Sequence, residues 1–232
     1  MIAGHDPQAF LALGDIVYPE ATTANMERYY EPGYGRLDEI VWPTPGNHDY
    51  LSDDDPLPGY VEYFERRAPH APVGEQYYIT ELGAWHVYSL NSEIGEGAAG
   101  SEMYRWLEDR LAADDHECIA AMWHSPVYTA GRKPYDEDGM RPIYDLLVDH
   151  GADVILTGHD HNYQRWDVDG IAYFVVGTGG KSRYEIDESA EGLAFGSDLV
   201  NGALQLDLMA DGARFTYRTM DDEVIDRGSI RC

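Results

Sequence analysis

Lysine is nearly absent from the chain: only Lys133 and Lys181 occur among its 232 residues. Lysine and arginine together number 16 against 43 aspartates and glutamates, which gives a formal net charge of −27 at pH 7. A surface of this sign repels nucleic acid and anionic lipid, so we expect no nucleic-acid duplex as a partner. Two origins of the acidity stay open: adaptation to a salt-rich host, in which ions screen the repulsion, or a GC-rich genome that favours arginine and aspartate.

Cysteine is also scarce, with Cys118 in an apolar run and Cys232 as the last residue. These cysteines offer neither a disulfide framework nor zinc-knuckle spacing, and Cys118 is predicted to be a small buried apolar side chain. No stretch approaches the roughly 18 consecutive apolar residues of a membrane-spanning helix, so we expect no membrane span. Residues 1–6 lack the basic start and apolar stretch of a signal peptide, and the cellular location and the oligomeric state stay open.

The rest of the composition is that of a globular protein, with 44% hydrophobic and 25% charged residues. No internal repeat, low-complexity tract or linker interrupts the chain, so we expect a single domain over residues 1–232. Short apolar runs predict strands at 10–13, 40–42 (stopped by Pro43 and Pro45), 77–80, 85–90, 118–123, 154–156 and 173–176, followed by an antiparallel meander over 204–230. Apolar residues at helical spacing predict helices at 24–30, 57–67, 101–111 and 140–150.

The order of these elements predicts the fold class. Strands alternate with helices over the first two-thirds of the chain, and hairpins follow. Such an order is typical of a layered α/β protein, because each sheet must bury its apolar face against another layer. We therefore expect a four-layer αββα sandwich, in which two mixed β-sheets pack face to face and helices flank them.

Metal-ligand side chains follow the predicted strands at several points. They occur as Gly14-Asp15-Ile16-Val17-Tyr18, as Gly46-Asn47-His48-Asp49, as the single His124, and as Gly158-His159-Asp160-His161. Loops at the carboxyl ends of strands are where α/β sheets build their sites, and glycine lets the backbone approach a metal or a phosphate closely. Each cluster alone has an ordinary explanation, as a turn or as a core histidine. Together they offer enough oxygen and imidazole ligands for two adjacent cations.

This order of motifs resembles the calcineurin-like metallophosphoesterase superfamily. Tyr18, three residues after Asp15, is similar to the tyrosine that distinguishes the purple acid phosphatase branch, and Tyr163 and Arg165 after His161 also fit that branch. The motifs extend over about two-thirds of the chain. The resemblance implies an αββα fold and a site for two metal ions, which are ferric iron with ferrous iron, zinc or manganese.

The resemblance also implies a role for each residue. Asp15 would bridge the metals, Tyr18 and His161 would bind the first metal, and Tyr163 and Arg165 would support the ligands from behind. The second metal would be bound by Asn47, His124 and His159. His48 would stabilise or protonate the leaving oxygen of the substrate, and Asp49 would orient its imidazole.

The activity implied by the resemblance is hydrolysis of a small phosphate ester. We expect a phosphomonoesterase in which metal-bound hydroxide attacks phosphorus in line. A phosphodiesterase with the same metal core and an inactive metal-binding scaffold are the alternatives. The scaffold is favoured by one departure from the family pattern: the first motif, an Asp-x-Gly whose aspartate binds the first metal, does not occur before Gly14, where Asp6 is the only acidic residue. We therefore expect the N-terminal strand to be missing from the chain as given, through a misplaced start or a truncation.

Overall fold

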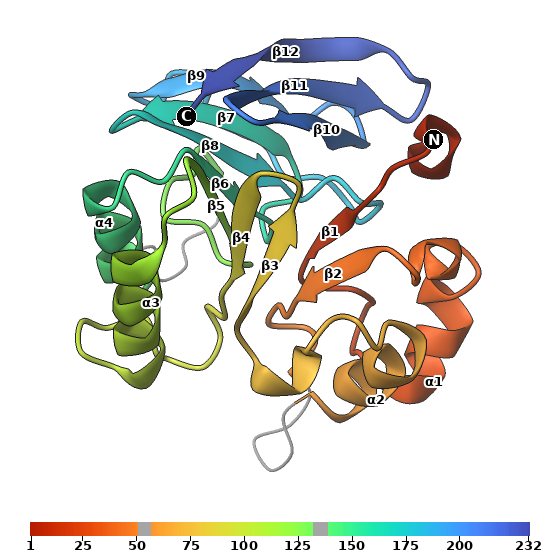
Figure 1. Ribbon diagram of the computed structural model, residues 1–232. Coiled ribbons are helices and arrows are strands. Elements are labelled where there is room, and N and C mark those ends of the chain that lie inside the picture. The colour runs from red at the N-terminus through yellow and green to blue at the C-terminus, as the bar shows by residue number, and fades with distance from the viewer. Residues whose placement is uncertain (51–56, 132–138) are drawn as a thin grey trace.

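The computed structural model describes residues 1–50, 57–131 and 139–232. Over these residues the chain forms a helical layer, a seven-stranded sheet, a second layer of strands and another helical layer (Figure 1). The predicted αββα class is therefore confirmed.

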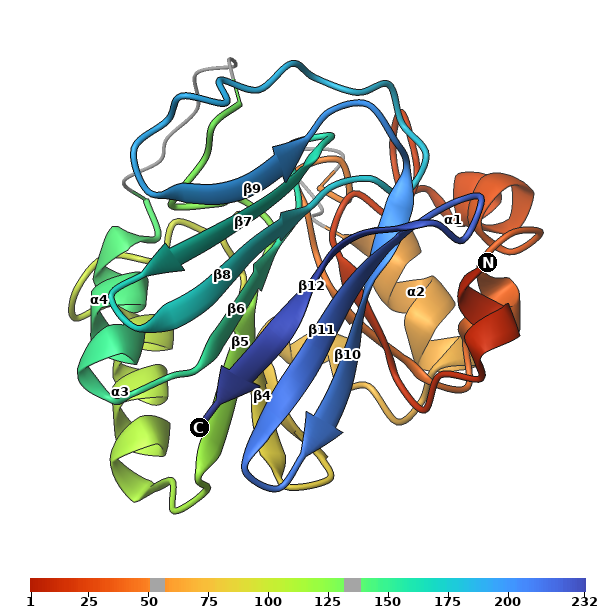
Figure 2. The same ribbon diagram turned by 90° about the horizontal axis from the view of Figure 1, so that it is seen from above.

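The seven-stranded sheet is mixed and lies at the centre of the molecule (Figure 2). Its strands, in spatial order, are β3 (Tyr78–Leu82), β4 (Trp85–Ser89), β5 (Cys118–Met122), β6 (Val154–Thr157), β8 (Ile171–Val176), β7 (Tyr163–Val168) and β9 (Leu193–Ser197). The central strands β4, β5, β6 and β8 are parallel, whereas β3, β7 and β9 pair in antiparallel fashion. Every residue of β5 and β6 is buried, because layers cover both faces of the sheet.

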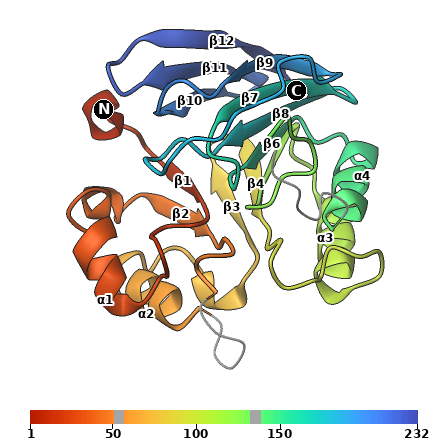
Figure 3. The same cartoon turned by 180° about the vertical axis from the view of Figure 1, so that it is seen from behind.

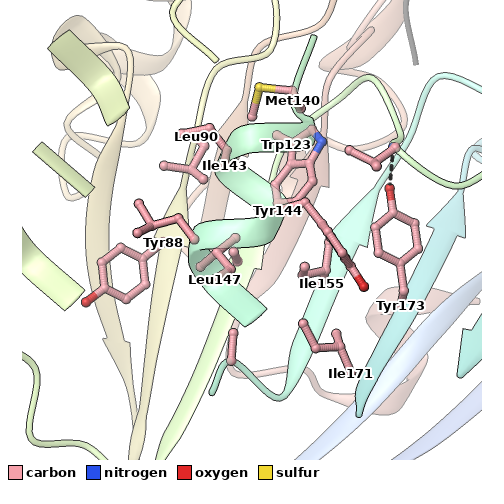
Figure 4. Packing of buried hydrophobic residues seen from close by; sticks show 14 of the residues in the cluster. Tyr88, Leu90, Trp123, Met140, Ile143, Tyr144, Leu147, Ile155, Ile171 and Tyr173 are labelled. Atoms are coloured by element: carbon pink, nitrogen blue, oxygen red, sulfur yellow. Dashed lines mark hydrogen bonds between the residues drawn. The ribbon is translucent and has the colours of Figure 1, made fainter. Parts of the chain in front are cut away.

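Helices α3 (Glu102–Ala113) and α4 (Arg141–Asp149) cover one face of this sheet (Figure 1). The side chain of Ser101 caps α3, since its hydroxyl accepts a hydrogen bond from the backbone N–H of Tyr104 at 3.2 Å. Figure 4 shows the apolar face of α4 packed on the sheet, with Leu147 among the buried side chains. In the same view, the hydroxyl of Tyr173 accepts a hydrogen bond from the backbone N–H of Val127 at 2.7 Å.

The second layer of strands consists of separate sheets, where one mixed sheet was expected. The parallel pair is β1 (Phe10–Leu13) with β2 (Val41–Thr44), and the antiparallel meander is β10 (Gly202–Met209), β11 (Gly212–Thr219) and β12 (Val224–Arg231). The strand at 40–42 does not stop before Pro43, because Pro43 lies inside β2. An edge strand with a single neighbour tolerates a residue that lacks an N–H.

Short helices form the outer layer over β1 and β2 (Figure 1). Helix α1 (Thr23–Asn25) continues into a π-helical segment, Met26–Tyr30, so the helix predicted at 24–30 exists but changes type halfway. Helix α2 (Pro58–Arg67) packs against this segment through aromatic rings, and the buried cluster includes Met26, Tyr30, Tyr60, Tyr63 and Phe64. Within the described ranges, no helix has the length and apolar character needed to cross a membrane.

Strands β1 and β10 belong to separate sheets (Figure 3). Residues of both strands line a cavity of about 1110 Å³. Its apolar floor includes Val87, Val154 and Leu156 of the seven-stranded sheet. The cavity follows β1 along its length and reaches Asp15 and His161 beyond its carboxyl end. The open space therefore leads directly to the side chains that the sequence indicated as metal ligands.

Cys118 is fully buried as predicted, but a disulfide joins it to Cys232, so the expectation that these cysteines offer no disulfide is wrong. Cys118 is the first residue of β5, and β12 ends next to Cys232. The antiparallel meander carries the chain end across the large sheet and brings the two Cα atoms to 5.1 Å. Their sequence separation of 114 residues leaves no local pattern that could have indicated the bond.

Candidate metal centre

Strand ends from both β-layers meet at one side of the molecule. Asp15 follows β1 and Asn47 follows β2, while His124 and His159 follow β5 and β6. Because β1 is parallel to β2 and β5 is parallel to β6, each pair sends its carboxyl ends in one direction. The fold thereby brings side chains from distant parts of the sequence to one place.

The first group of donor atoms surrounds Nε2 of His124. This atom lies 3.3 Å from Oδ1 of Asp15, 3.2 Å from Oδ1 of Asn47 and 3.1 Å from Nδ1 of His159. Nδ1 of His159 is in turn 3.0 Å from the same oxygen of Asn47. The donor atoms of Asp15, His124 and His159 all lie within 4.8 Å of one another, which makes them a candidate ligand set for one ion.

The second group lies on the other side of Asp15. The hydroxyl of Tyr18 donates a hydrogen bond to Oδ2 of Asp15 at 2.7 Å and is 2.9 Å from Nε2 of His161. The two oxygens of Asp15 therefore face different donor groups, one toward His124 and one toward Tyr18. A carboxylate in this position is suited to bridge two cations.

Backbone carbonyls orient two of the imidazoles. Nδ1 of His124 lies 2.7 Å from the carbonyl oxygen of Leu13, and Nδ1 of His161 lies 2.6 Å from that of Ser182. Each contact fits a protonated Nδ1 and leaves Nε2 facing the centre as a lone-pair donor, an arrangement typical of metal-binding histidines.

Close backbone approach makes glycine necessary beside the ligands. A Cβ on Gly14 would lie 2.5 Å from Nδ1 of His124, and a Cβ on Gly46 would lie 2.4 Å from the backbone nitrogen of Asp15. Asp15 and His159 themselves adopt left-handed backbone conformations, with φ of 51° and 62°. Non-glycine residues rarely adopt such φ values, and they concentrate at functional sites.

The electrostatics of the centre depend on the contact between Asp15 and His124. Burial opposes the charge of Asp15, yet the hydrogen bond and the charge of His124 outweigh it and lower the pKa of this carboxyl below its ordinary range. Burial would lower the pKa of His124, but Asp15 raises it to about 9. Burial and the nearby His124 lower the pKa of His159 to about 4. Burial and the carboxylate of Asp15 raise the pKa of the Tyr18 phenol.

The chemistry of the donors fits transition metals. Together the groups offer a carboxylate, an amide oxygen, a phenol and three imidazoles. Imidazole suits iron and zinc, and oxygen donors add affinity for harder cations such as ferric iron. All six residues that the sequence indicated as ligands, which are Asp15, Tyr18, Asn47, His124, His159 and His161, belong to this one cluster.

The expected contact between His48 and Asp49 is replaced by others. Asp49 is fully buried and accepts hydrogen bonds from the backbone N–H groups of Gly46 and Ile16, at 2.8 and 3.1 Å. Burial raises the pKa of Asp49 to about 7. The imidazole of His48 instead places Nδ1 2.7 Å from the carbonyl oxygen of Pro19. Asp49 thus holds the loops after β1 and β2 together and does not orient the His48 ring.

Tyr163 and Arg165 lie in β7 and hold the two β-layers together. The Tyr163 hydroxyl donates to Oδ2 of Asp226 at 2.8 Å, and Nε of Arg165 donates to the same oxygen at 2.9 Å. Asp226 belongs to β12. The expectation that these residues support the ligands from behind is therefore corrected: side chains alternate across a strand, and these two face the meander.

Two residues after β8 also contact proposed ligands, and the sequence did not indicate them as site residues. Lys181 places Nζ 4.1 Å from the centre of the Tyr18 ring, and the Tyr184 ring stacks on His161 with centroids 4.2 Å apart. The sequence contained one signal, since Lys181 is one of only two lysines and directly follows a glycine-rich turn.

Comparison with known proteins identifies a family of phosphoesterases. The profile of the calcineurin-like phosphoesterase family matches residues 1–163. Purple acid phosphatase 18 of Arabidopsis thaliana is 27% identical over 241 residues, which cover 90% of this chain and 53% of that protein. The Fe(3+)-Zn(2+) purple acid phosphatase 12 of the same plant is 26% identical over 188 residues, which cover 73% of this chain and 39% of that protein.

A solved structure has the same fold. The purple acid phosphatase from yellow lupin (Lupinus luteus) seeds superposes with a TM-score of 0.77 at 18% identity, over 98% of this chain and 47% of that protein. The chain spans between 24% and 58% of the length of the plant purple acid phosphatases that it matches in sequence.

Proposed function

Because the chain belongs to the calcineurin-like phosphoesterase family, we propose that it is a binuclear metal-dependent phosphatase of the purple acid phosphatase type. The observation that carries the proposal is the position of Asp15, whose two carboxylate oxygens face separate groups of donors. Tyr18 and His161 would hold one ion with Asp15. Asn47, His124 and His159 would hold the other.

The metals of the proposal are ferric iron in the first position and ferrous iron, zinc or manganese in the second. Similarity to an Fe(3+)-Zn(2+) purple acid phosphatase supports iron with zinc as the first combination to test. When bound, such a pair polarises a phosphoryl oxygen and supplies hydroxide near neutral pH.

The chain's own residues would position the ester beside this pair. The contact of His48 Nδ1 with the Pro19 carbonyl leaves Nε2 free of that contact, and with a proton on both nitrogens His48 would donate from Nε2 to the leaving oxygen. Lys181 and His48 both contact the ring of Tyr18, so a cation and an imidazole lie next to this proposed ligand. They provide local attraction for a phosphate in a chain whose net charge is −27.

Monoesters are the proposed substrates, and a phosphodiesterase is the alternative. The lysine and imidazole donors suit the dianionic phosphate of a monoester better than the monoanion of a diester. We expect turnover of p-nitrophenyl phosphate to exceed turnover of bis(p-nitrophenyl) phosphate by at least tenfold. The reverse order would favour the phosphodiesterase.

Ligand variants test the binuclear site itself. We expect Asp15→Asn and His161→Ala each to lower the bound metal per chain and to abolish turnover, because each leaves a cation with too few ligands. His150→Ala is the matched control, since His150 is an exposed histidine at the end of α4. Full metal content in both ligand variants would contradict the assignment. A wild type that binds metal but hydrolyses neither ester would support the scaffold alternative.

A further inference from the structure

A second cluster of metal-ligating side chains lies at the opposite end of the seven-stranded sheet from the candidate metal centre. Glu81 in β3 and His86 in β4 are cross-strand partners, and His86 lies near the amino end of its strand. Asp114 ends α3, and His116 follows it in the turn that leads to β5. The candidate metal centre lies beyond the carboxyl ends of these parallel strands, so the clusters share no residue.

A single buried carboxylate orients both imidazoles. Oδ2 of Asp114 lies 2.7 Å from Nδ1 of His86, and Oδ1 lies 3.1 Å from Nδ1 of His116. The side chain of Asp114 is only 1% exposed. The two rings stack with centroids 3.5 Å apart and an angle of 27° between their planes. Both rings therefore direct Nδ1 at Asp114, which leaves Nε2 of each ring available to an ion.

Glu81 supplies an oxygen on the side of these nitrogens. Its Oε1 lies 3.6 Å from Nε2 of His86, and donor atoms of Glu81, His86 and His116 all lie within 4.8 Å of one another. The Glu81 side chain is 71% exposed and can therefore adjust its rotamer toward an ion at little cost. Solvent can reach the cluster and occupy a fourth position.

We propose that Glu81, His86 and His116 bind a structural Zn²⁺ ion. Two imidazole nitrogens, one carboxylate oxygen and a water form a common tetrahedral zinc site. A carboxylate that holds the far nitrogen of each ligating histidine is the usual outer partner of zinc, and Asp114 holds two at once. The ion would join the β3–β4 hairpin to the turn before β5, beside the disulfide at Cys118.

Zinc binding to the full chain tests the site by equilibrium dialysis and by thermal unfolding. We expect the double variant His86→Gln/His116→Gln to bind one fewer Zn²⁺ per chain than wild type. Its melting temperature should also rise less when zinc is added. His150→Gln is the matched control and should behave like wild type. Turnover of p-nitrophenyl phosphate should stay unchanged in all of these variants, which separates this site from the proposed phosphatase.

Single variants keep the test decisive if the double variant unfolds. Glu81→Gln changes an exposed side chain and should weaken zinc binding at this site at least tenfold. Asp114→Asn should weaken it by about 10- to 100-fold, as loss of an outer carboxylate does. Unchanged zinc stoichiometry and affinity in Glu81→Gln and in His116→Gln would overturn the proposal, as would zinc anomalous scattering confined to the centre around Asp15.

Discussion

At the scale of single residues, the contact between Asp15 and Tyr18 connects the sequence motif to the chemistry. The phenol donates to a buried carboxylate at 2.7 Å, and this contact, together with burial, raises the pKa of Tyr18. A phenol in this state keeps its proton in the metal-free chain. Only a strongly charged cation such as Fe³⁺ would favour the phenolate over the phenol.

A visible absorption band in the iron-loaded protein would therefore report on Tyr18. We expect Tyr18→Phe to lose this charge-transfer band while its far-UV circular dichroism stays that of wild type. Absorption spectra at matched iron content provide the measurement. A colourless wild type that is fully active with divalent metals alone would remove Tyr18 from the ligands.

His48 contributes to the centre in two separable ways. Its backbone N–H donates to Oδ1 of Asp15 at 2.9 Å, while its imidazole contacts the Pro19 carbonyl and the Tyr18 ring. We expect His48→Ala to retain its metals, because the backbone contact survives, and to lose about 10²-fold or more in kcat as a missing proton donor would. Metal analysis with steady-state kinetics measures both effects. Unchanged kcat would give His48 a purely structural role.

At the scale of secondary-structure elements, contacts of the meander with the central sheet secure the C-terminal part of the chain. Asp226 in β12 receives hydrogen bonds from Tyr163 and Arg165 in β7, and the rings of Tyr163 and Tyr217 stack with centroids 4.0 Å apart. The disulfide from Cys118 to Cys232 fastens the end of β12 to the start of β5. Side-chain contacts and the disulfide thus join the meander to the seven-stranded sheet.

Removal of the disulfide should destabilise the fold without changing the centre. We expect Cys232→Ser to lower the free energy of unfolding by about 2–4 kcal/mol, because the bond closes a long loop in the unfolded chain. Thermal melts with and without a reductant are the measurement. The reductant should lower the melting temperature of wild type and leave that of Cys232→Ser unchanged. A wild type that does not respond to the reductant contradicts the bond.

At the scale of the whole molecule, the net charge of −27 opposes compaction. Some of the few basic residues form ion pairs: Arg67 pairs with Glu31 and Asp38, and Arg165 pairs with Asp167 and Asp226. Acidic residues outnumber basic ones by 43 to 16, so repulsion among carboxylates remains, and dissolved ions screen it.

Salt should stabilise the protein over a wide range. We expect the melting temperature to rise steadily from 0.1 M to 2 M KCl, because screening relieves repulsion that is stronger in the compact state than in the unfolded chain. Differential scanning calorimetry provides the measurement, and KCl is chosen because it affects apolar burial less than sulfate does. A flat or falling melting temperature would assign the acidity to genome composition.

The sequence by itself determined most of the strands, the main helices and the ligand types of the candidate centre, but it did not indicate β7 and β9. Apolar runs followed by a metal-ligand residue, with glycine before it in every case but His124, are local features, so Asp15, Asn47, His124 and His159 could be recognised without coordinates. The parallel order of strands then required their carboxyl ends to converge. The αββα class followed from the order of elements, because each sheet needs a layer on both faces.

Only the tertiary structure decided which side chains meet across long separations. The disulfide partner of Cys118, the contacts of Asp49 and of Tyr163, the position of Lys181 over Tyr18, and the cluster of Glu81, His86 and His116 all depend on how layers and turns come together. The division of the second layer into two sheets was likewise decided only by the tertiary structure. Local periodicity records which face of an element is buried, whereas the identity of the neighbour on that face is a property of the assembled fold.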